Sequence, residues 1–67
     1  MFIFAYKITK QEAEVVELIS LGLSNQQIAD KMYVSLTTVR THIYYIFQKT
    51  GATSRVNLLR MVSGYRQ

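Results

Sequence analysis

Apolar and polar residues recur at helical spacing through nearly the whole chain, and the pattern is clearest between residues 36 and 50. With about 100° of rotation per residue around a helix, its polar and phenolic side chains fall in one narrow stripe. This stripe contains Thr37, Arg40, Thr41, Tyr44 and Gln48. Roughly opposite lie the apolar residues Val39, Ile43, Ile46 and Phe47. The pattern predicts a helix that packs through the side of Val39 and turns Arg40 and Thr41 outward.

Start and stop signals divide the rest of the chain into further helices. A residue with a cap-forming hydroxyl precedes each apolar run, at Thr9, Ser24, Ser35 and Ser54. Glu12 and Gln27 follow the first two caps by three residues and complete capping boxes. Gly22 and Gly51 are typical helix stops, because glycine readily adopts the left-handed conformation just past a helix end. We therefore expect an all-α, compact four-helix domain, with helices from about residue 10 to Gly22, from Ser24, over about 36–50, and after Ser54.

The first two of these helices supply much of the predicted core. The apolar face of the first contains Val15, Val16, Leu18 and Ile19, while Glu14 and Glu17 face water. In the second, Ala29 sits where the neighbouring helix would approach most closely. A larger side chain at that position would push the two helices apart.

Composition limits the possible kinds of site. The chain has 67 residues, which is enough for one small domain, and it has no cysteine and a single histidine, which argues against a structural zinc site. Its formal charge of +4 favours a polyanionic partner, although many ordinary small domains are also basic. The apolar start, residues 1–7, is too short for a signal peptide or a membrane span and is taken as an extension of a domain over 8–67. We expect a cytoplasmic, nucleoid-associated protein with no metal, no cofactor and no contact with a membrane.

Several short motifs lie in unbroken register along most of the chain. They are T-x-x-E-x-E-V at 9–15, G-L-S-N at 22–25, I-A at 28–29, V-S-x-x-T-V-R-T-H at 34–42, K-x-G at 49–51 and S-R at 54–55. Together they resemble the LuxR-type DNA-binding domain, also called FixJ- or GerE-type. The resemblance implies a four-helix domain whose second and third helices form a helix-turn-helix, and whose fourth helix supports dimerisation. Members of this family bind promoter DNA as dimers and regulate transcription.

The resemblance and the polar stripe together predict which residues contact DNA. These are Asn25, Thr37, Thr38, Arg40, Thr41, Tyr44, Tyr45 and Lys49. Arg40 is the strongest candidate, for a base or a phosphate, since an arginine can bond to guanine through two donors. The threonines suit phosphate oxygens or a thymine methyl group, Tyr44 the groove, and Tyr45 a phosphate. The alternatives are solvated surface side chains, a tyrosine packed within the domain, and a simple helix-start role for Asn25.

The fourth helix carries an apolar arc of roughly 160°, wider than one core contact needs. Either this helix is deeply buried, or part of the arc binds a second subunit. The predicted dimer residues are Asn57, Leu58, Met61, Val62 and Tyr65. The matching positions in the family also suggest that Arg55 pairs with Glu12 or Glu14 and ties the last helix to the first.

The chain departs from the family pattern at a few positions. Thr50 stands where leucine is usual, and its hydroxyl is expected to bond back to a helix carbonyl. Tyr44 and Tyr45 replace smaller or charged residues, so base preference cannot be carried over from the family. Residues 2–6 have no counterpart. His42, on the flank of the apolar face, is expected to be a packed structural histidine.

These observations favour a sequence-specific, dimeric transcription regulator that binds double-stranded promoter DNA, with RNA polymerase as a candidate second partner. The alternative is a protein-interaction module that docks a partner through the fourth helix and residues 2–6. The sequence has no nucleophile–base pair, no glycine-rich phosphate loop and no metal cluster, so we do not expect an enzyme. The chain resembles either the short stand-alone members of the family or a module excised from a longer regulator.

Overall fold

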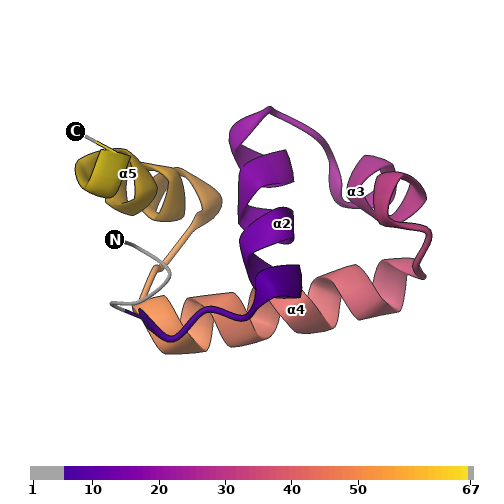
Figure 1. The fold of residues 1–67 in the computed structure, drawn as a ribbon, viewed down its shortest axis with the longest axis horizontal. Helices are drawn as coiled ribbons and strands as arrows, with labels where there is room; N and C mark the ends of the chain where they lie inside the picture. Colours follow the sequence, from indigo (N-terminus) through magenta and orange to yellow (C-terminus); the bar gives the residue numbers. More distant parts are fainter. Residues whose placement is uncertain (1–5, 67) are drawn as a thin grey trace.

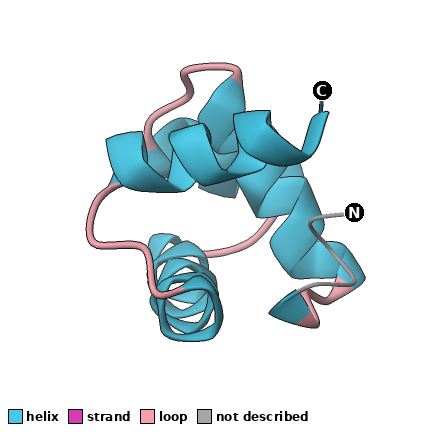
Figure 2. Cartoon of the chain, turned by 90° about the vertical axis from the view of Figure 1, so that its left-hand side faces the viewer, coloured by secondary structure: helices cyan, strands magenta, loops and turns pink. Residues whose placement is uncertain are grey.

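The computed structural model describes the backbone of residues 6–66 and the side chains of residues 6–64. This part of the chain forms helices α2 (Lys10–Ser20), α3 (Asn25–Met32), α4 (Leu36–Thr50) and α5 (Arg55–Arg66), and it contains no strand. In Figure 1 α4 runs along one side of the molecule and α2 stands across it, with α3 and α5 on either side of α2. Figure 2, turned by 90°, shows α4 nearly end-on beneath the others. The predicted all-α, four-helix architecture is confirmed.

Each helix starts at the hydroxyl residue that the sequence predicts. The Thr9 side chain accepts the N–H of Glu12 at 3.1 Å, and the Glu12 carboxylate accepts the N–H of Thr9 at 2.9 Å. Ser24 and Gln27 form the same reciprocal pair at the start of α3. The hydroxyl oxygen of Ser35 accepts the N–H of Thr38, and that of Ser54 accepts the N–H of Asn57, each at 3.1 Å. These side chains satisfy backbone donors that have no partner within the helix.

The helix ends use left-handed residues, and one of these was not predicted. Gly22 and Gly51 have φ angles of 88° and 75°, which confirms both as helix stops. Between α3 and α4 the same conformation falls on Tyr33, with φ of 58° and ψ of 42°. The N–H of Val34 then donates to the carbonyl of Ala29 at 3.0 Å, in the arrangement of a Schellman motif. This left-handed residue makes the turn that directs the chain from α3 into α4.

The core lies where α2, α3, α4 and α5 meet. Its fully buried side chains are Val15, Ile19, Ile28, Val39, Ile46 and Leu58. The predicted face of α2 is confirmed, because Val16 and Leu18 are also buried while Glu14 and Glu17 are exposed. Ala29 is 1% exposed, so the small residue does sit inside the contact made by α3. Burial of Val39 and Ile46 in this core fixes the orientation of α4 and thereby determines which of its side chains face outward.

Candidate nucleic-acid interface

The outer face of α4 is a continuous polar and phenolic surface. Its exposed side chains are Thr37, Arg40, Thr41, Tyr44 and Gln48. On the opposite side Val39 and Ile46 are fully buried, and Ile43 and Phe47 are half-buried against the core. The predicted amphipathic helix is therefore confirmed, with Arg40 and Thr41 facing outward. Because α4 is anchored through its apolar side, this surface is presented by a rigid element.

The hydroxyl groups at the start of α4 are partly used within the helix. Thr38, which is half-buried, shares a hydrogen bond of 3.0 Å with the hydroxyl of Ser35. Thr41 donates its hydroxyl proton to the carbonyl of Thr37 at 3.0 Å. That leaves the oxygen of Thr41 able to accept a bond, but its proton is committed. Of the threonines expected to contact DNA, Thr37 is the one whose hydroxyl makes no hydrogen bond among the described residues.

Tyr44 and Tyr45 both lie on the surface of α4. Their side chains are 59% and 51% exposed, so neither is buried in the domain. The two rings contact each other edge to face, with centroids 5.5 Å apart and planes inclined at 72°. Such a pair stabilises the orientation of both rings by about 0.5–1.5 kcal/mol. The tyrosines therefore form a preorganised aromatic surface beside Arg40 and Thr41.

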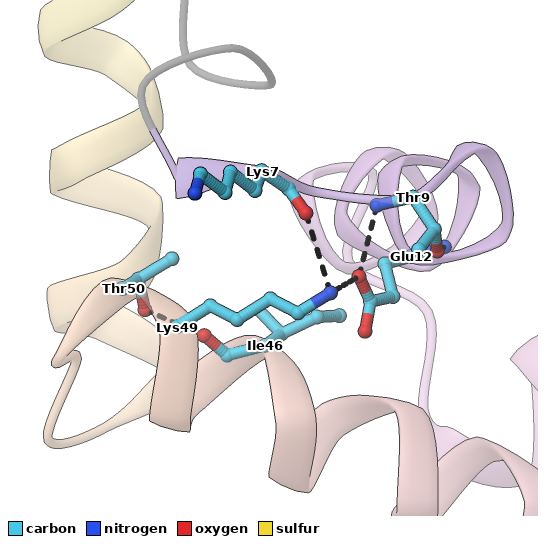
Figure 3. A network of polar contacts seen from close by, with 6 residues as sticks. All are labelled: Lys7, Thr9, Glu12, Ile46, Lys49 and Thr50. Atoms are coloured by element: carbon cyan, nitrogen blue, oxygen red, sulfur yellow. Dashed lines mark hydrogen bonds and ion pairs between the residues drawn. The ribbon is translucent and has the colours of Figure 1, made fainter.

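Lys49, also expected to contact DNA, is bonded to groups of its own domain, although its side chain is 31% exposed. Figure 3 shows its ammonium group between two oxygens, one from Glu12 in the first turn of α2 and one from Lys7 in the segment before α2. The Nζ atom lies 2.6 Å from a carboxylate oxygen of Glu12 and 3.3 Å from the carbonyl oxygen of Lys7. Lys49 thus joins the C-terminal end of α4 to the start of α2. Its role as a DNA contact remains a prediction, and it would compete with these bonds.

Glu12 is the acceptor at the centre of this network. Its burial alone raises the pKa of the carboxyl, but the hydrogen bonds from Lys49 and Thr9 and the positive charge of Lys49 outweigh burial, so the pKa lies below its ordinary value. The side chain of Glu12 is 5% exposed and therefore nearly inaccessible to solvent. The sequence identified Glu12 as a capping residue, but its ion pair with Lys49 was missed.

Thr50 is the last residue of α4, next to Lys49. Its hydroxyl donates to the carbonyl of Ile46 at 2.8 Å and accepts the N–H of Ala52 at 3.2 Å. The expected bond to a helix carbonyl is confirmed. The polar group that replaces the usual leucine is therefore satisfied in both directions, although the residue is only 8% exposed.

The predicted pairing of Arg55 with Glu12 or Glu14 is wrong. Its guanidinium donates to the side-chain oxygen of Asn25 at 2.7 Å and to the carbonyl of Leu23 at 2.8 Å. Arg55 is half-buried where the start of α5 meets the loop before α3, whereas Glu12 lies beside Lys49. Asn25, expected to offer its amide to a phosphate, thus uses its oxygen inside the domain. Its amide nitrogen and the nearby backbone donors remain candidates for DNA contact.

The dimer surface predicted on α5 must be corrected. Leu58 is fully buried and Val62 is 7% exposed, since both belong to the core of this domain. Leu58 and Val62 are therefore covered by their own domain and do not belong to the candidate dimer surface. Met61 and Asn57 are half-buried and remain predictions, although the Asn57 oxygen accepts the N–H of Thr53 at 3.1 Å. The side chain of Tyr65 lies outside the described residues.

Val56 and Tyr33 are exposed apolar residues that the sequence analysis did not single out. Val56, on α5, is 61% exposed, and Tyr33, in the turn before α4, is 95% exposed. Helical spacing could have indicated Val56, because it falls outside the arc that contains Leu58. No local pattern marks Tyr33 as left-handed, since glycine is the usual residue there.

The described residues contain no group of three or more His, Cys, Asp or Glu side chains placed to hold a metal ion. None of the helices in this part of the chain is both long and apolar enough to cross a bilayer. His42 is half-buried on the flank of α4.

Comparison with known proteins places the chain among helix-turn-helix regulators. Residues 7–62 match the family described as bacterial regulatory proteins, luxR family. The chain is 46% identical over 52 residues to a Mycobacterium tuberculosis protein named as an HTH-type transcriptional regulator, Rv0890c, covering 78% of this chain and 6% of that protein. It is 45% identical over 51 residues to the Bacillus subtilis transcriptional regulatory protein YxjL, covering 76% of this chain and 23% of that protein.

The chain therefore spans less than a quarter of the length of these relatives. The family match nevertheless extends from residue 7, two residues before the first cap, into α5, so it includes every element that positions the outer face of α4. The motifs at 22–29 and 34–42 correspond to α3 and α4, joined by the turn at Tyr33. On these grounds the chain belongs to the LuxR family of bacterial regulatory proteins and carries its helix-turn-helix domain.

Proposed function

We propose that this chain binds double-stranded promoter DNA in a sequence-specific manner and regulates transcription, with α4 entering the major groove. The observation that carries the proposal is the exposed stripe that contains Thr37, Arg40 and Tyr44, opposite the buried Val39. The major groove admits an α-helix, and guanidinium, hydroxyl and aromatic groups can bond to base edges and phosphates there. Family membership supports the same function, which involves no catalysis.

The remaining helices have supporting roles in this proposal. As in other helix-turn-helix domains, α3 would cross the DNA backbone while α4 reads the bases. The start of α3 offers backbone N–H groups and the amide of Asn25 to a phosphate. Lys31, exposed in the last turn of α3, adds a positive charge to this helix. These contacts would set the orientation of α4 without contributing to base recognition.

We further propose that two subunits bind through the exposed part of α5 and read half-sites about one helical turn of DNA apart. Val56 and Met61 supply the apolar surface that Leu58 and Val62 do not offer. Replacing Met61 with glutamate should weaken both self-association and apparent DNA affinity. Unchanged sedimentation of the folded variant would contradict the dimer while leaving DNA binding by a single domain intact.

A fluorescence-anisotropy titration with promoter-containing duplexes tests the main proposal. The affinity should fall as salt rises, because binding releases counterions from the phosphates, and it should exceed the affinity for a scrambled duplex of the same composition. Arg40→Ala should weaken binding strongly. Lys10→Ala is the control, because it removes one positive charge from an exposed position on α2, outside both the stripe and the proposed dimer surface. Absence of binding by the folded protein, or an affinity independent of salt, would remove the proposal.

A protein-interaction module is the second candidate. It is favoured by the exposed Val56 on α5, while residues 2–5 of the expected docking segment lie outside the described part of the chain. Tyr6, the last residue of that segment, packs against the core. Under this reading a partner protein, with RNA polymerase as one candidate, would bind α5 and be unaffected by Arg40→Ala. Loss of partner binding in a Val56→Glu variant that still binds DNA would show that both functions coexist.

A further inference from the structure

Aromatic surface, rather than charge, dominates the outer face of α4. Arg40 is the one charged residue of the exposed stripe. Lys49, outside the stripe at the end of the helix, is paired with Glu12. The hydroxyl proton of Thr41 is bonded to its own helix. Tyr44 and Tyr45 therefore present the largest side chains that α4 offers to a partner. Two adjacent exposed phenols are unusual on a domain surface, since their rings carry much apolar area.

The positions of the Tyr44 and Tyr45 rings on α4 indicate different roles for the two residues. Tyr44 lies within the stripe between Arg40 and Gln48, at the centre of the exposed face of α4. Tyr45 is one position round the helix, about 100° away, and its ring meets that of Tyr44 at an interplanar angle of 72°. Tyr44 is therefore placed to reach a partner in front of the stripe, and Tyr45 limits the directions in which the Tyr44 ring can turn.

We propose that Tyr44 recognises thymine through contact between its ring and the C5-methyl group in the major groove, and that Tyr45 is a positioning residue that holds the ring in place. This inference rests on the proposed function. The thymine methyl is the apolar group on the base edges of the major groove, so it is the feature that an aromatic ring can select. Arg40, beside Tyr44 on the same face, can read guanine at a neighbouring position. In this assignment Tyr45 acts through its ring, which positions Tyr44, and not through the hydrogen bond from its hydroxyl to a phosphate that the sequence suggested.

Replacing thymine with uracil tests the inference, because the change removes only the methyl group. A duplex is first selected from a random-sequence pool by the wild-type protein. Each thymine of the selected site is then replaced singly by uracil, and the dissociation constant is measured by anisotropy at one salt concentration. We expect at least one replacement to weaken wild-type binding about fourfold, the effect of one buried methyl group.

Paired variants assign this effect to the two tyrosines. Tyr44→Phe keeps the ring and should retain the difference between thymine and uracil, whereas Tyr44→Ala should bind both duplexes equally and more weakly. Tyr45→Phe should behave as the wild type, and Tyr45→Ala should reduce the difference. If Tyr45 instead contacts a phosphate through its hydroxyl, Tyr45→Phe will weaken binding to all duplexes alike. The two phenylalanine variants keep the ring pair and should keep the wild-type melting temperature, whereas the alanine variants lose the pair and should melt slightly lower but stay folded, because neither residue belongs to the core.

The possible outcomes separate this inference from the proposed function. If the wild type selects a site but no thymine-to-uracil replacement weakens binding, thymine recognition is wrong while DNA binding stands. If Tyr44→Ala retains the wild-type preference for thymine, another residue reads the methyl group and the inference is equally wrong. If the folded wild-type protein binds no duplex in the pool, the proposed function fails, and the inference fails with it.

Discussion

Arg40 and Lys49 are cations on the same helix, and their surroundings differ sharply. Lys49 lies at the C-terminal end of α4, where its ammonium group is bonded to Glu12 and to the carbonyl of Lys7. Arg40 lies on the exposed stripe and makes no salt bridge with the described residues. One charge is used to hold helices together, and the other is left for a partner. The comparison shows that the number of positive residues on a helix overstates the charge available to DNA.

The same contrast holds for the hydroxyl and phenol groups along α4. Thr50 uses its hydroxyl as both donor and acceptor within the domain, while Thr37 and the two tyrosines face solvent. The hydroxyl of Thr50 therefore contributes to stability, and the groups on the outer stripe are available for the proposed contact with DNA. Variants at the two places should separate unfolding from DNA affinity.

Glu12→Ala should have the largest effect, and on stability alone. The change removes one half of the capping box of α2 and leaves the ammonium group of Lys49 without its carboxylate, which together should cost about 2–3 kcal/mol. Urea unfolding followed by circular dichroism measures this cost. The control Glu17→Ala, at an exposed position of the same helix, should change the free energy of unfolding by less than about 0.5 kcal/mol. An equal cost for both variants would contradict a structural role for the pair.

Arg40→Ala should show the opposite behaviour. Loss of one arginine that contacts a base costs about 1–3 kcal/mol in binding, or roughly 5- to 150-fold in the dissociation constant. Stability should change by less than about 0.5 kcal/mol, because the side chain is exposed. Lys49→Ala is the matched comparison and should lower stability more than DNA affinity. A stronger loss of affinity from Lys49→Ala than from Arg40→Ala would reverse the roles assigned to the two cations.

Thr50→Val should have a smaller effect. The substitution keeps the shape of the side chain but removes the bond to Ile46 and leaves the N–H of Ala52 unsatisfied, which should cost about 1 kcal/mol of stability. Thermal unfolding at neutral pH provides the measurement. Thr37→Val makes the same chemical change on the outer stripe and should leave the melting temperature unchanged. Equal melting temperatures for the two variants would contradict the difference between the regions.

Acidification should give the smallest and most gradual change. The pKa of Glu12 is lowered from 4.5 in the folded protein, so its ionised form is favoured by folding. The resulting stability is fully present above pH 4.5 and is lost as pH falls through the lower, folded-state pKa. Glu12→Gln preserves a capping side chain but cannot ionise. The stability difference between wild type and this variant should therefore shrink below pH 4.5, and a difference that grows on acidification would contradict the direction of the pKa shift.

Local features of the chain were predicted well from the sequence. Caps such as Thr9 and Ser35 and stops such as Gly51 depend on residues only a few positions away, and the structure confirms them. The two faces of α4 follow from helical period in the same way. Tyr33 escaped prediction because a tyrosine has no preference of its own for the left-handed conformation that ends α3.

Long-range partners could not be predicted in this way. Lys49 and Glu12 are 37 positions apart, and Arg55 and Asn25 are 30 apart, so their pairing depends on how the helices cross. Helical spacing says which face a residue occupies, but not which of several acceptors lies opposite. The same limit explains Leu58, since a wide apolar arc does not reveal which part of it the domain covers itself.

A single titration tests most directly whether the outer stripe of α4 is the DNA-binding surface. Uniformly ¹⁵N-labelled protein is titrated with a duplex that it selects, and the change in each amide resonance is followed by NMR. We expect the largest changes at residues 37–48 and around the start of α3, with small changes at Glu12. Large changes confined to α5, with those of Arg40 and Tyr44 unaffected, would contradict the account.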